Sequence, residues 1–181
     1  MKKNYFKNYL DRYSEILIKS DINKLKKIAN LINDIKIKKK KVIIIGNGGS
    51  ASIASHVCVD LTKICKVRSV NFNEANLLTC FSNDYGYAHW AQKALSFYAD
   101  KGDLLICVSS SGKSMNIINA AKYAKKVGCK IITLTGFSNK NKLKKLGHIN
   151  LWLDSKNYNF IEMTHQTWLL SVVDFLVKAK F

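Results

Sequence analysis

Apolar residues recur every three or four positions over residues 4–35, a spacing typical of one or two amphipathic helices. Beyond residue 41, short runs of consecutive apolar residues alternate with longer segments of helical spacing. The short runs predict buried strands at 42–45, 69–72, 103–109, 130–136 and 148–154. The longer segments predict helices at 50–65, 74–84, 88–98, 114–128 and 161–180. Strands that are apolar throughout and alternate with helices are typical of a parallel α/β sheet covered on both faces.

The length of the chain bounds its organisation. A chain of 181 residues is long enough to bury one core, and we expect residues 1–181 to form a single domain. The amphipathic helices within residues 1–35 present an apolar face that needs another surface to cover it. We therefore expect this N-terminal helical arm to be used in oligomerisation.

Composition bears on the class of protein and its location. A hydrophobic content of 48% excludes a disordered chain, and no apolar run reaches the ~18 residues of a membrane span. The first residues, MKKNYFKNYLDRYSEIL, soon become amphipathic and charged, unlike a signal peptide. We expect a cytoplasmic location. The 5 cysteines contain no CxxC pair, which favours small buried side chains in a reducing compartment.

The net charge of +18 favours anionic partners, phosphorylated metabolites among them. Its densest part is the run KIKKKK at 36–41, between a predicted helix and the first predicted strand. A run in that position favours a solvated connector over a nucleic-acid tether. Because no basic stretch is interleaved with aromatic residues, nucleic acid is not the expected partner.

Two loops rich in glycine and serine follow predicted strands. GNGGS (46–50) comes after the first strand and SSSGKS (109–114) after the strand at 103–109. In parallel sheets, ligands bind beyond the carboxyl ends of the strands, so both loops are expected at one site. The first loop matches neither GxxxxGK[ST] nor GxGxxG. Serine hydroxyls and backbone amides at the start of a helix are suited to a phosphate, although Ser114 could simply cap that helix.

Three segments carry a resemblance to a known family: GNGGSASIASH (46–56), FSNDYGY (81–87) and SSSGKSMNIINAAKYAKKVGCKIITLTG (109–136). They resemble the sugar isomerase (SIS) domain family, in its phosphoheptose isomerase branch. The resemblance implies a flavodoxin-like three-layer αβα sandwich around a five-stranded parallel sheet. It also implies a homotetramer built as a dimer of dimers, with a phosphosugar at the subunit interface. The implied activity is aldose–ketose isomerisation of sedoheptulose 7-phosphate or a related sugar phosphate, as in surface polysaccharide biosynthesis.

The resemblance also assigns binding residues. The implied phosphate ligands are four hydroxyls, those of Ser109, Ser110, Ser111 and Ser114. The residues implied to contact the sugar come from two segments: Asn47, Gly48, Gly49, Ser50, Asn83 and Asp84. Lys113 stands where the family commonly has Asn, and its ammonium group either strengthens phosphate binding or faces solvent.

Catalysis is where the chain departs from the family. The isomerisation moves a proton between neighbouring carbons through an enediol, which needs a base, an acid and exclusion of water. At the positions of the family's His, Glu, Gln and His, this sequence has His56, Asp60, Glu162 and Leu170. Aspartate sets the carboxylate back by ~1.5 Å, and a misplacement of that size can cost ~100-fold in rate. Leu170 can neither donate nor accept a proton.

Three interpretations stay open. In an altered active site, Asp60 or Glu162 is the base and His56 or His165 the acid, since each His shares a helix face with one carboxylate. Alternatively, the protein binds a phosphosugar without turnover, as a sensor or as the scaffold of an active paralogue. In the third, the same chemistry acts on a different ketose phosphate.

The resemblance implies that the protein requires no cofactor, although some members of the family bind zinc at these four positions. His and carboxylate side chains are ordinary zinc ligands. His56, Asp60 and Glu162 are therefore candidate metal ligands as well as candidate catalytic residues.

Overall fold

Five parallel strands in the order β2-β1-β3-β4-β5 form the centre of the computed structural model, which describes residues 4–180. The strands are β1 (Val42–Ile45), β2 (Ser69–Val70), β3 (Leu104–Ser109), β4 (Lys130–Thr135) and β5 (Ile149–Trp152). This strand order is that of the flavodoxin-like sheet, so the expected α/β sandwich is confirmed. All five predicted strands are present, but the one at 69–72 pairs over only two residues, Ser69 and Val70.

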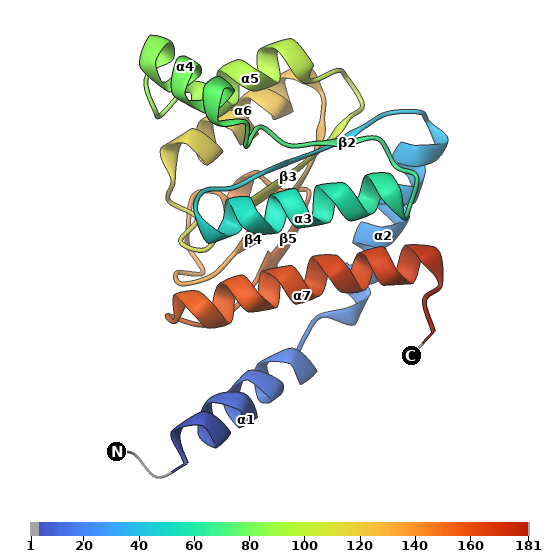
Figure 1. The fold of residues 1–181 in the computed structure, drawn as a ribbon, viewed down its shortest axis with the longest axis vertical. Helices are drawn as coiled ribbons and strands as arrows, with labels where there is room; N and C mark the ends of the chain where they lie inside the picture. Colours follow the sequence, from blue (N-terminus) through green and yellow to red (C-terminus); the bar gives the residue numbers. More distant parts are fainter. Residues whose placement is uncertain (1–3, 181) are drawn as a thin grey trace.

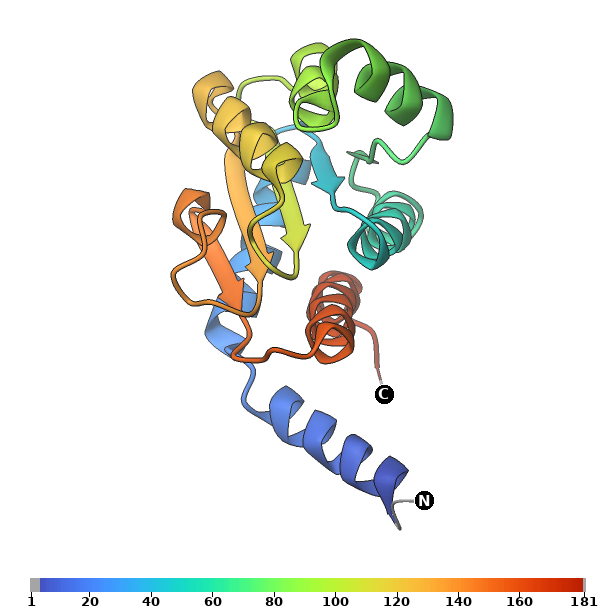
Figure 2. The same ribbon diagram turned by 90° about the vertical axis from the view of Figure 1, so that its left-hand side faces the viewer.

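Helices cover both faces of the sheet (Figure 1, Figure 2). They are α1 (Tyr5–Ile18), α2 (Ile22–Ile37), α3 (Gly49–Lys63), α4 (Ala75–Tyr85), α5 (Trp90–Tyr98), α6 (Met115–Val127) and α7 (Tyr158–Val177), with a 3-10 turn at Lys144–Leu146. One core lies between the sheet and α2, α3 and α7. A second core lies between the sheet and α5 and α6, with α4 packed at its margin.

Alternation along the strands explains the two cores. Successive side chains of a strand point to opposite faces. In β1, Val42 and Ile44 therefore join the α2–α3–α7 core, while Ile43 and Ile45 join the α5–α6 core. Because both faces are covered, all four residues are buried, and the strand is a continuous apolar run.

The N-terminal arm divides into two unlike helices. α2 buries Ile28, Ala29, Ile32 and Ile35 against the sheet. α1 has no buried residue and projects from the body, as Figure 2 shows. Its contact with the body includes the rings of Tyr9 and Tyr13 packed on Phe160 of α7. The apolar side chains that needed a cover remain exposed on α1, with Phe6 80% exposed.

Other expectations from composition have mixed outcomes. Four of the cysteines are buried as predicted, but Cys80 on α4 is exposed. Burial raises the pKa of the Cys129 thiol to about 11, so this thiol stays protonated at neutral pH. Within residues 4–180, no helix is long and apolar enough to span a membrane.

Candidate functional site

The two glycine- and serine-rich loops meet beyond the carboxyl ends of neighbouring strands. β1 pairs with β3, with Ile45 opposite Cys107, so the loops that follow them leave the sheet side by side. A hollow of about 140 Å³ lies between these loops and the start of α7. Its lining combines residues from three parts of the chain: Asn47, Ser50, Val108, Ser109, Ser110, Ser111, Ser114, Tyr158 and Glu162. The hollow thus brings six of the predicted binding residues together with one predicted catalytic residue, Glu162.

The serine loop makes a tight turn at the start of α6. Gly112 has a φ of +61°, which glycine adopts without strain, and its N–H donates to the Ser109 carbonyl at 3.0 Å. Ser114 is the N-cap residue of α6, as the alternative role predicted, but its side chain makes no capping hydrogen bond. Its hydroxyl instead accepts from the Ser109 hydroxyl at 3.5 Å. The Ser109 and Ser114 hydroxyls therefore meet at the start of α6, where helix N-terminal amides favour an anion.

Lys113 does not take part in this convergence. Its side chain is exposed and does not line the hollow. Its backbone N–H donates to the Ser111 hydroxyl at 3.2 Å, which fixes the turn. Of its two expected roles, the structure favours the solvent-facing one.

A pair of asparagines fixes the first loop. The Asn47 amide donates to Asn116 Oδ1 at 3.1 Å, and the Asn116 amide donates back to Asn47 Oδ1 at 2.8 Å. Tyr87 Oη also donates to Asn47 Oδ1, at 3.3 Å. Asn116 is 2% exposed, and sequence reasoning missed it although a polar residue on the apolar face of α6 was a usable signal.

The other sugar-contacting pair lies elsewhere. Asn83 and Asp84 are exposed near the end of α4. Their side chains bond to each other, with Asn83 Nδ2 donating to Asp84 Oδ1 at 3.0 Å. Neither residue lines the hollow within this chain. Their contact with the sugar therefore stays a prediction.

Glu162 joins the two loops. Its Oε1 accepts a hydrogen bond from Ser110 Oγ at 3.4 Å. On its other side the carboxylate lies against Gly49, where an added Cβ would be 2.8 Å from Glu162 Cδ. Glu162 also lines a neighbouring hollow of about 370 Å³, together with Gly49, Gln166 and five other residues: Tyr9, Ser52, Ile53, Asn159 and Met163. The carboxylate is therefore shared by both hollows.

His56 and Asp60 form a chain of contacts with a residue that sequence reasoning missed. His56 Nε2 lies 3.3 Å from Asp60 Oδ2, as expected for residues four apart on a helix. The other ring nitrogen, Nδ1, lies 3.2 Å from Gln166 Nε2. A neutral imidazole with its proton on Nε2 satisfies both contacts. Neither His56 nor Asp60 lines the hollows that contain Glu162, and the His56 side chain is 49% exposed.

His165 is not placed to be an acid. It is fully buried, and its Nε2 lies 3.3 Å from the Thr135 carbonyl. Burial lowers the pKa of this imidazole to about 4, only partly offset by the contact with Thr135. The expectation that Glu162 and His165 share a working face is therefore corrected, because α7 turns His165 into the core.

Comparison with known proteins agrees with this geometry. A family model described as the SIS domain matches residues 4–136. The chain belongs to the SIS domain family.

Its similarity to curated SIS domain proteins lies in the phosphoheptose isomerase branch. It is 34% identical over 173 residues to the phosphoheptose isomerase of Aliarcobacter butzleri, covering 91% of each chain. It is 30% identical over 182 residues to a probable phosphoheptose isomerase of Thermoplasma acidophilum, covering 97% of this chain and 98% of that one. Among solved structures, the phosphoheptose isomerase GmhA from Neisseria gonorrhoeae superposes with a TM-score of 0.85 at 26% identity. That match covers 93% of this chain and 92% of the other.

The zinc set expected of some SIS domain proteins does not fit this chain. His56 and Asp60 contact each other, but Glu162 lies instead with Ser110 and Gly49. Leu170 packs against the core and carries no donor atom. Within residues 4–180, no group of three or more His, Cys, Asp and Glu side chains could hold a metal ion. The proposed ligand set of His56, Asp60 and Glu162 is corrected accordingly, and no step below uses a metal.

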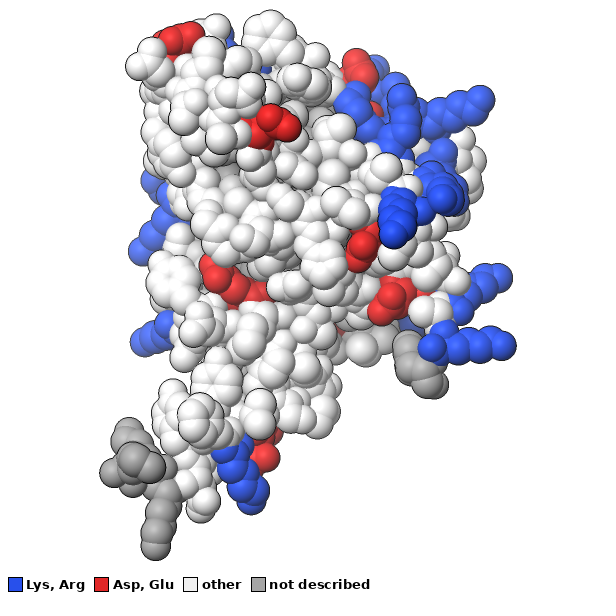
Figure 3. Space-filling model, viewed as in Figure 1, with Lys and Arg blue, Asp and Glu red and all other residues white. Residues whose placement is uncertain are grey.

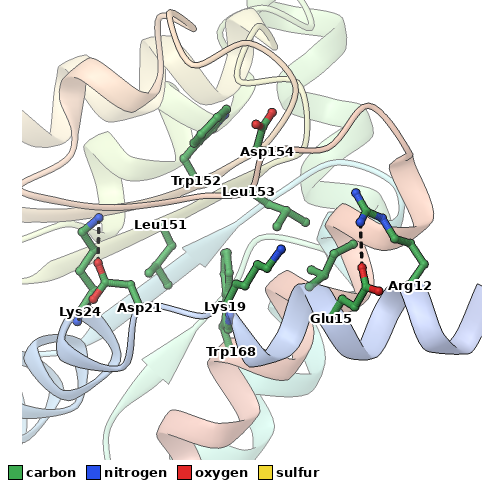
Figure 4. A pocket seen from close by; sticks show the side chains of 11 residues that line it. Arg12, Glu15, Lys19, Asp21, Lys24, Leu151, Trp152, Leu153, Asp154 and Trp168 are labelled. Carbon is green, nitrogen blue, oxygen red and sulfur yellow. Dashed lines mark hydrogen bonds and ion pairs between the residues drawn. The ribbon is translucent and has the colours of Figure 1, made fainter.

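A larger hollow, of about 440 Å³, lies away from the loops, between α1, α2, β5 and α7 (Figure 4). Several of its charged side chains are already paired, Arg12 with Glu15 at 2.9 Å and Lys24 with Asp21 at 3.2 Å. Trp168 at its floor donates to Ser20 Oγ at 2.7 Å. The two ion pairs are local to α1 and to the start of α2, whereas the Trp168 bond ties the connection between α1 and α2 to α7, and we assign the hollow a structural role.

Proposed function

We propose that this SIS domain protein binds a phosphorylated sugar and interconverts its aldose and ketose forms. The expected reaction is that of its relatives, sedoheptulose 7-phosphate to D-glycero-D-manno-heptose 7-phosphate or a related pair. The observation that carries the proposal is a carboxylate, Glu162, facing the serine loop across one small hollow. The setting we propose is the cytoplasm, and the pathway surface polysaccharide biosynthesis.

The orientation of the substrate follows from the direction of the serine side chains. Ser109 points toward Ser114 and the start of α6, whereas Ser110, the next residue, points toward Glu162. The phosphate would bind at Ser109, Ser111 and Ser114. The sugar would then extend past Glu162, because the hollow of about 140 Å³ is smaller than the ~300 Å³ at which ligand pockets begin. The adjoining hollow of about 370 Å³ would take the rest of the sugar.

Glu162 would be the base. Its carboxylate would take the proton from the carbon next to the carbonyl, and the C–H electron pair would form the double bond of the enediol. The carbonyl oxygen would gain a proton from a water molecule in the same step. Glu162 would return its proton to the former carbonyl carbon, and the hydroxyl on the first carbon would lose a proton to water and become the new carbonyl, so atoms and charge balance.

Asp60 would act through other residues. Asp60 contacts His56, and His56 contacts Gln166. These two contacts would hold the Gln166 amide at the rim of the adjoining hollow of about 370 Å³ that Glu162 also lines. We infer a positioning role for Asp60 and His56, in place of direct proton transfer.

A second candidate function is phosphosugar binding without turnover, as in a sensor or the scaffold of an active paralogue. Leu170 favours it, because a hydrocarbon packed on the core stands where the resemblance places an imidazole. Incubation with sedoheptulose 7-phosphate and other ketose phosphates in deuterated water separates the two candidates. Carbon-bound deuterium supports the isomerase. Saturable binding that Ser111→Ala weakens, with no deuterium in any sugar, would establish binding alone.

We also infer that the protein is a homo-oligomer. α3 and α7 run across the face seen in Figure 1, and Figure 3 shows that most of this face is uncharged. Apolar side chains are exposed there, Val59 at 58%, Ile64 at 47% and Phe175 at 56%. A second copy covering this face would bury them, and a dimer of dimers would also bring the projecting α1 against a neighbour.

Light scattering after size exclusion tests this arrangement. The wild-type protein should elute with the mass of four chains, and Val59→Lys with Phe175→Lys should reduce it. A monomeric wild type at micromolar concentration would refute the inference. The matched change on the opposite side of the sheet, Tyr98→Lys, should leave the mass unchanged.

A further inference from the structure

Five cationic side chains surround a hollow at the amino end of β1. This basic hollow has a volume of about 370 Å³ and is lined by Lys36, Lys39, Lys40, Lys66 and Arg68. Figure 3 shows Lys and Arg gathered on the side of the molecule where α2 ends and β1 begins. The serine loop lies beyond the other end of β1, so the basic hollow is separate from the phosphosugar site.

Two segments that are distant in the sequence build the basic hollow. One is the turn after α2, and the other is the turn after α3. Lys36 Nζ donates to the Cys65 carbonyl at 2.8 Å, and Arg68 donates to the Lys39 carbonyl. These two hydrogen bonds link the turns across the hollow and hold its walls in place.

Lysine occupies strained positions in both turns. Lys39 has a φ of +53° and Lys66 a φ of +56°, the left-handed region that glycine adopts without cost after a helix. The turn after α6 has glycine in the same role, Gly128 with a φ of +88°. Glycine would therefore suit the fold better than lysine at both positions. Lysine at these two positions places two charges on the hollow at the cost of backbone strain, whereas Lys178 after α7 has the same conformation outside the hollow.

The charges of the basic hollow are not balanced within its lining. Asp100 lies close enough for its pKa to be lowered, by Lys41 first and by Lys40 and Arg68 more weakly. Its carboxylate is bound by Lys41 Nζ at 2.6 Å and does not line the hollow. Five like charges around one concavity repel one another, and an anion bound between them would offset that repulsion.

We propose that the basic hollow binds a chain of two or more phosphate groups, as in inorganic triphosphate or a nucleoside triphosphate. Its volume is in the range of small-molecule sites, and five cations exceed the need of a single phosphate. A nucleic acid is disfavoured because the lining side chains are all cationic and offer no aromatic ring for a base to stack on.

Calorimetric titration with inorganic triphosphate, ATP and adenosine tests the proposal. Triphosphate and ATP should bind with similar affinity, more weakly as salt rises, and adenosine should not bind. The decisive variant is Lys39→Gly with Lys66→Gly. Loss of two charge-assisted contacts should weaken triphosphate binding by about tenfold or more. The melting temperature should rise, because glycine removes the backbone strain at both positions.

Two controls distinguish the basic hollow from other anion sites. Lys122→Gln with Lys126→Gln removes the same charge from the exposed face of α6, and should leave triphosphate binding unchanged. Ser111→Ala with Ser114→Ala alters the serine loop, and should also leave it unchanged. Equal loss in the α6 variant, or loss in the serine variant, overturns the proposal, as does a wild type that binds no triphosphate. Single-stranded RNA that binds more tightly with length and displaces triphosphate would assign the surface to nucleic acid instead.

Discussion

Replacing Glu162 with Gln removes one negative charge and the proposed base while keeping nearly the same shape. The variant should bind phosphate more tightly than the wild type and yet fail to exchange the substrate proton. These two effects point in opposite directions only if the carboxylate does chemistry beside the phosphate. A side chain that served the fold alone would change neither in this way.

The size of the gain in binding follows from the geometry. Glu162 Oε1 lies 3.4 Å from Ser110 Oγ, and the phosphate would bind one residue further along, at Ser109 and Ser114. The two anions would then be ~7 Å apart, and in water-like surroundings each pair of unit charges repels by about 0.6 kcal/mol. For a phosphate with nearly two charges the repulsion is about 1 kcal/mol, so Kd should fall about fivefold to tenfold in the variant. The water-like value is appropriate because Glu162 is only partly buried.

The loss of exchange should be larger. Removing a positioned base typically lowers the rate by about 10²- to 10⁴-fold. The assay is deuterium incorporation at carbon, followed by NMR, together with calorimetric binding of the same sugar phosphate.

Two further variants serve as controls for Glu162→Gln. Asp174→Asn removes an exposed charge from the same helix and should alter neither quantity. Glu162→Asp keeps the charge but moves the carboxylate back from the hollow by one methylene. It should slow deuterium exchange about 100-fold and leave binding of the sugar phosphate unchanged. Undiminished exchange in Glu162→Gln would refute the assignment of the base, and unchanged or weaker phosphate binding would refute the proposed path of the substrate.

Three other changes test the site and its surroundings. Gly112→Ala forces a Cβ to within 2.9 Å of Asn141 Cβ at a φ of +61°, so phosphate Kd should rise about tenfold by calorimetry, while an unchanged Kd would contradict the anion site. In Asp60→Asn, deuterium exchange should be slowed by less than about tenfold, because Asp60 only positions His56. Loss of all exchange in this variant would make Asp60 the base. The buried His165 has a pKa of about 4 against 6.5 when unfolded, so the unfolded chain binds the extra proton first as pH falls. Folding should therefore lose up to about 3 kcal/mol between pH 6.5 and 4, measured by urea unfolding, and His165→Gln should flatten this dependence.

The sheet was predictable from the sequence because its strands leave an unambiguous trace. All four residues of the run at 42–45 are β-branched, so the strand presents apolar side chains to both faces of the sheet. This fits burial between two helical layers. Gly128 marked the end of the helix that precedes β4, and it lies there at a positive φ. The short strand at 69–70 was overestimated, since the predicted strand extended through Asn71 and Phe72, beyond the last paired residue, Val70.

The sides of α7 were less predictable. Residues 161–180 are apolar nearly all round, so spacing alone could not say which residues face the core. Packing buries His165 with Trp168, while Glu162 faces the loops and Gln166, four residues on, contacts His56 of α3. The same limit applies to the lysine run at 36–41. Sequence predicted a solvated connector, but three of its lysines form a hollow with Lys66 and Arg68, which only the tertiary fold brings near.

Glu162 comes from the last helix, whereas the loops that it joins come from the first and middle thirds of the chain. The site therefore exists only while α7 is docked on α3 and the sheet. A sugar phosphate that binds it should slow amide hydrogen exchange in α7 as well as in the serine loop, because any opening that releases α7 also releases the ligand. During synthesis, the nascent chain can gain this protection only after its final helix has left the ribosome.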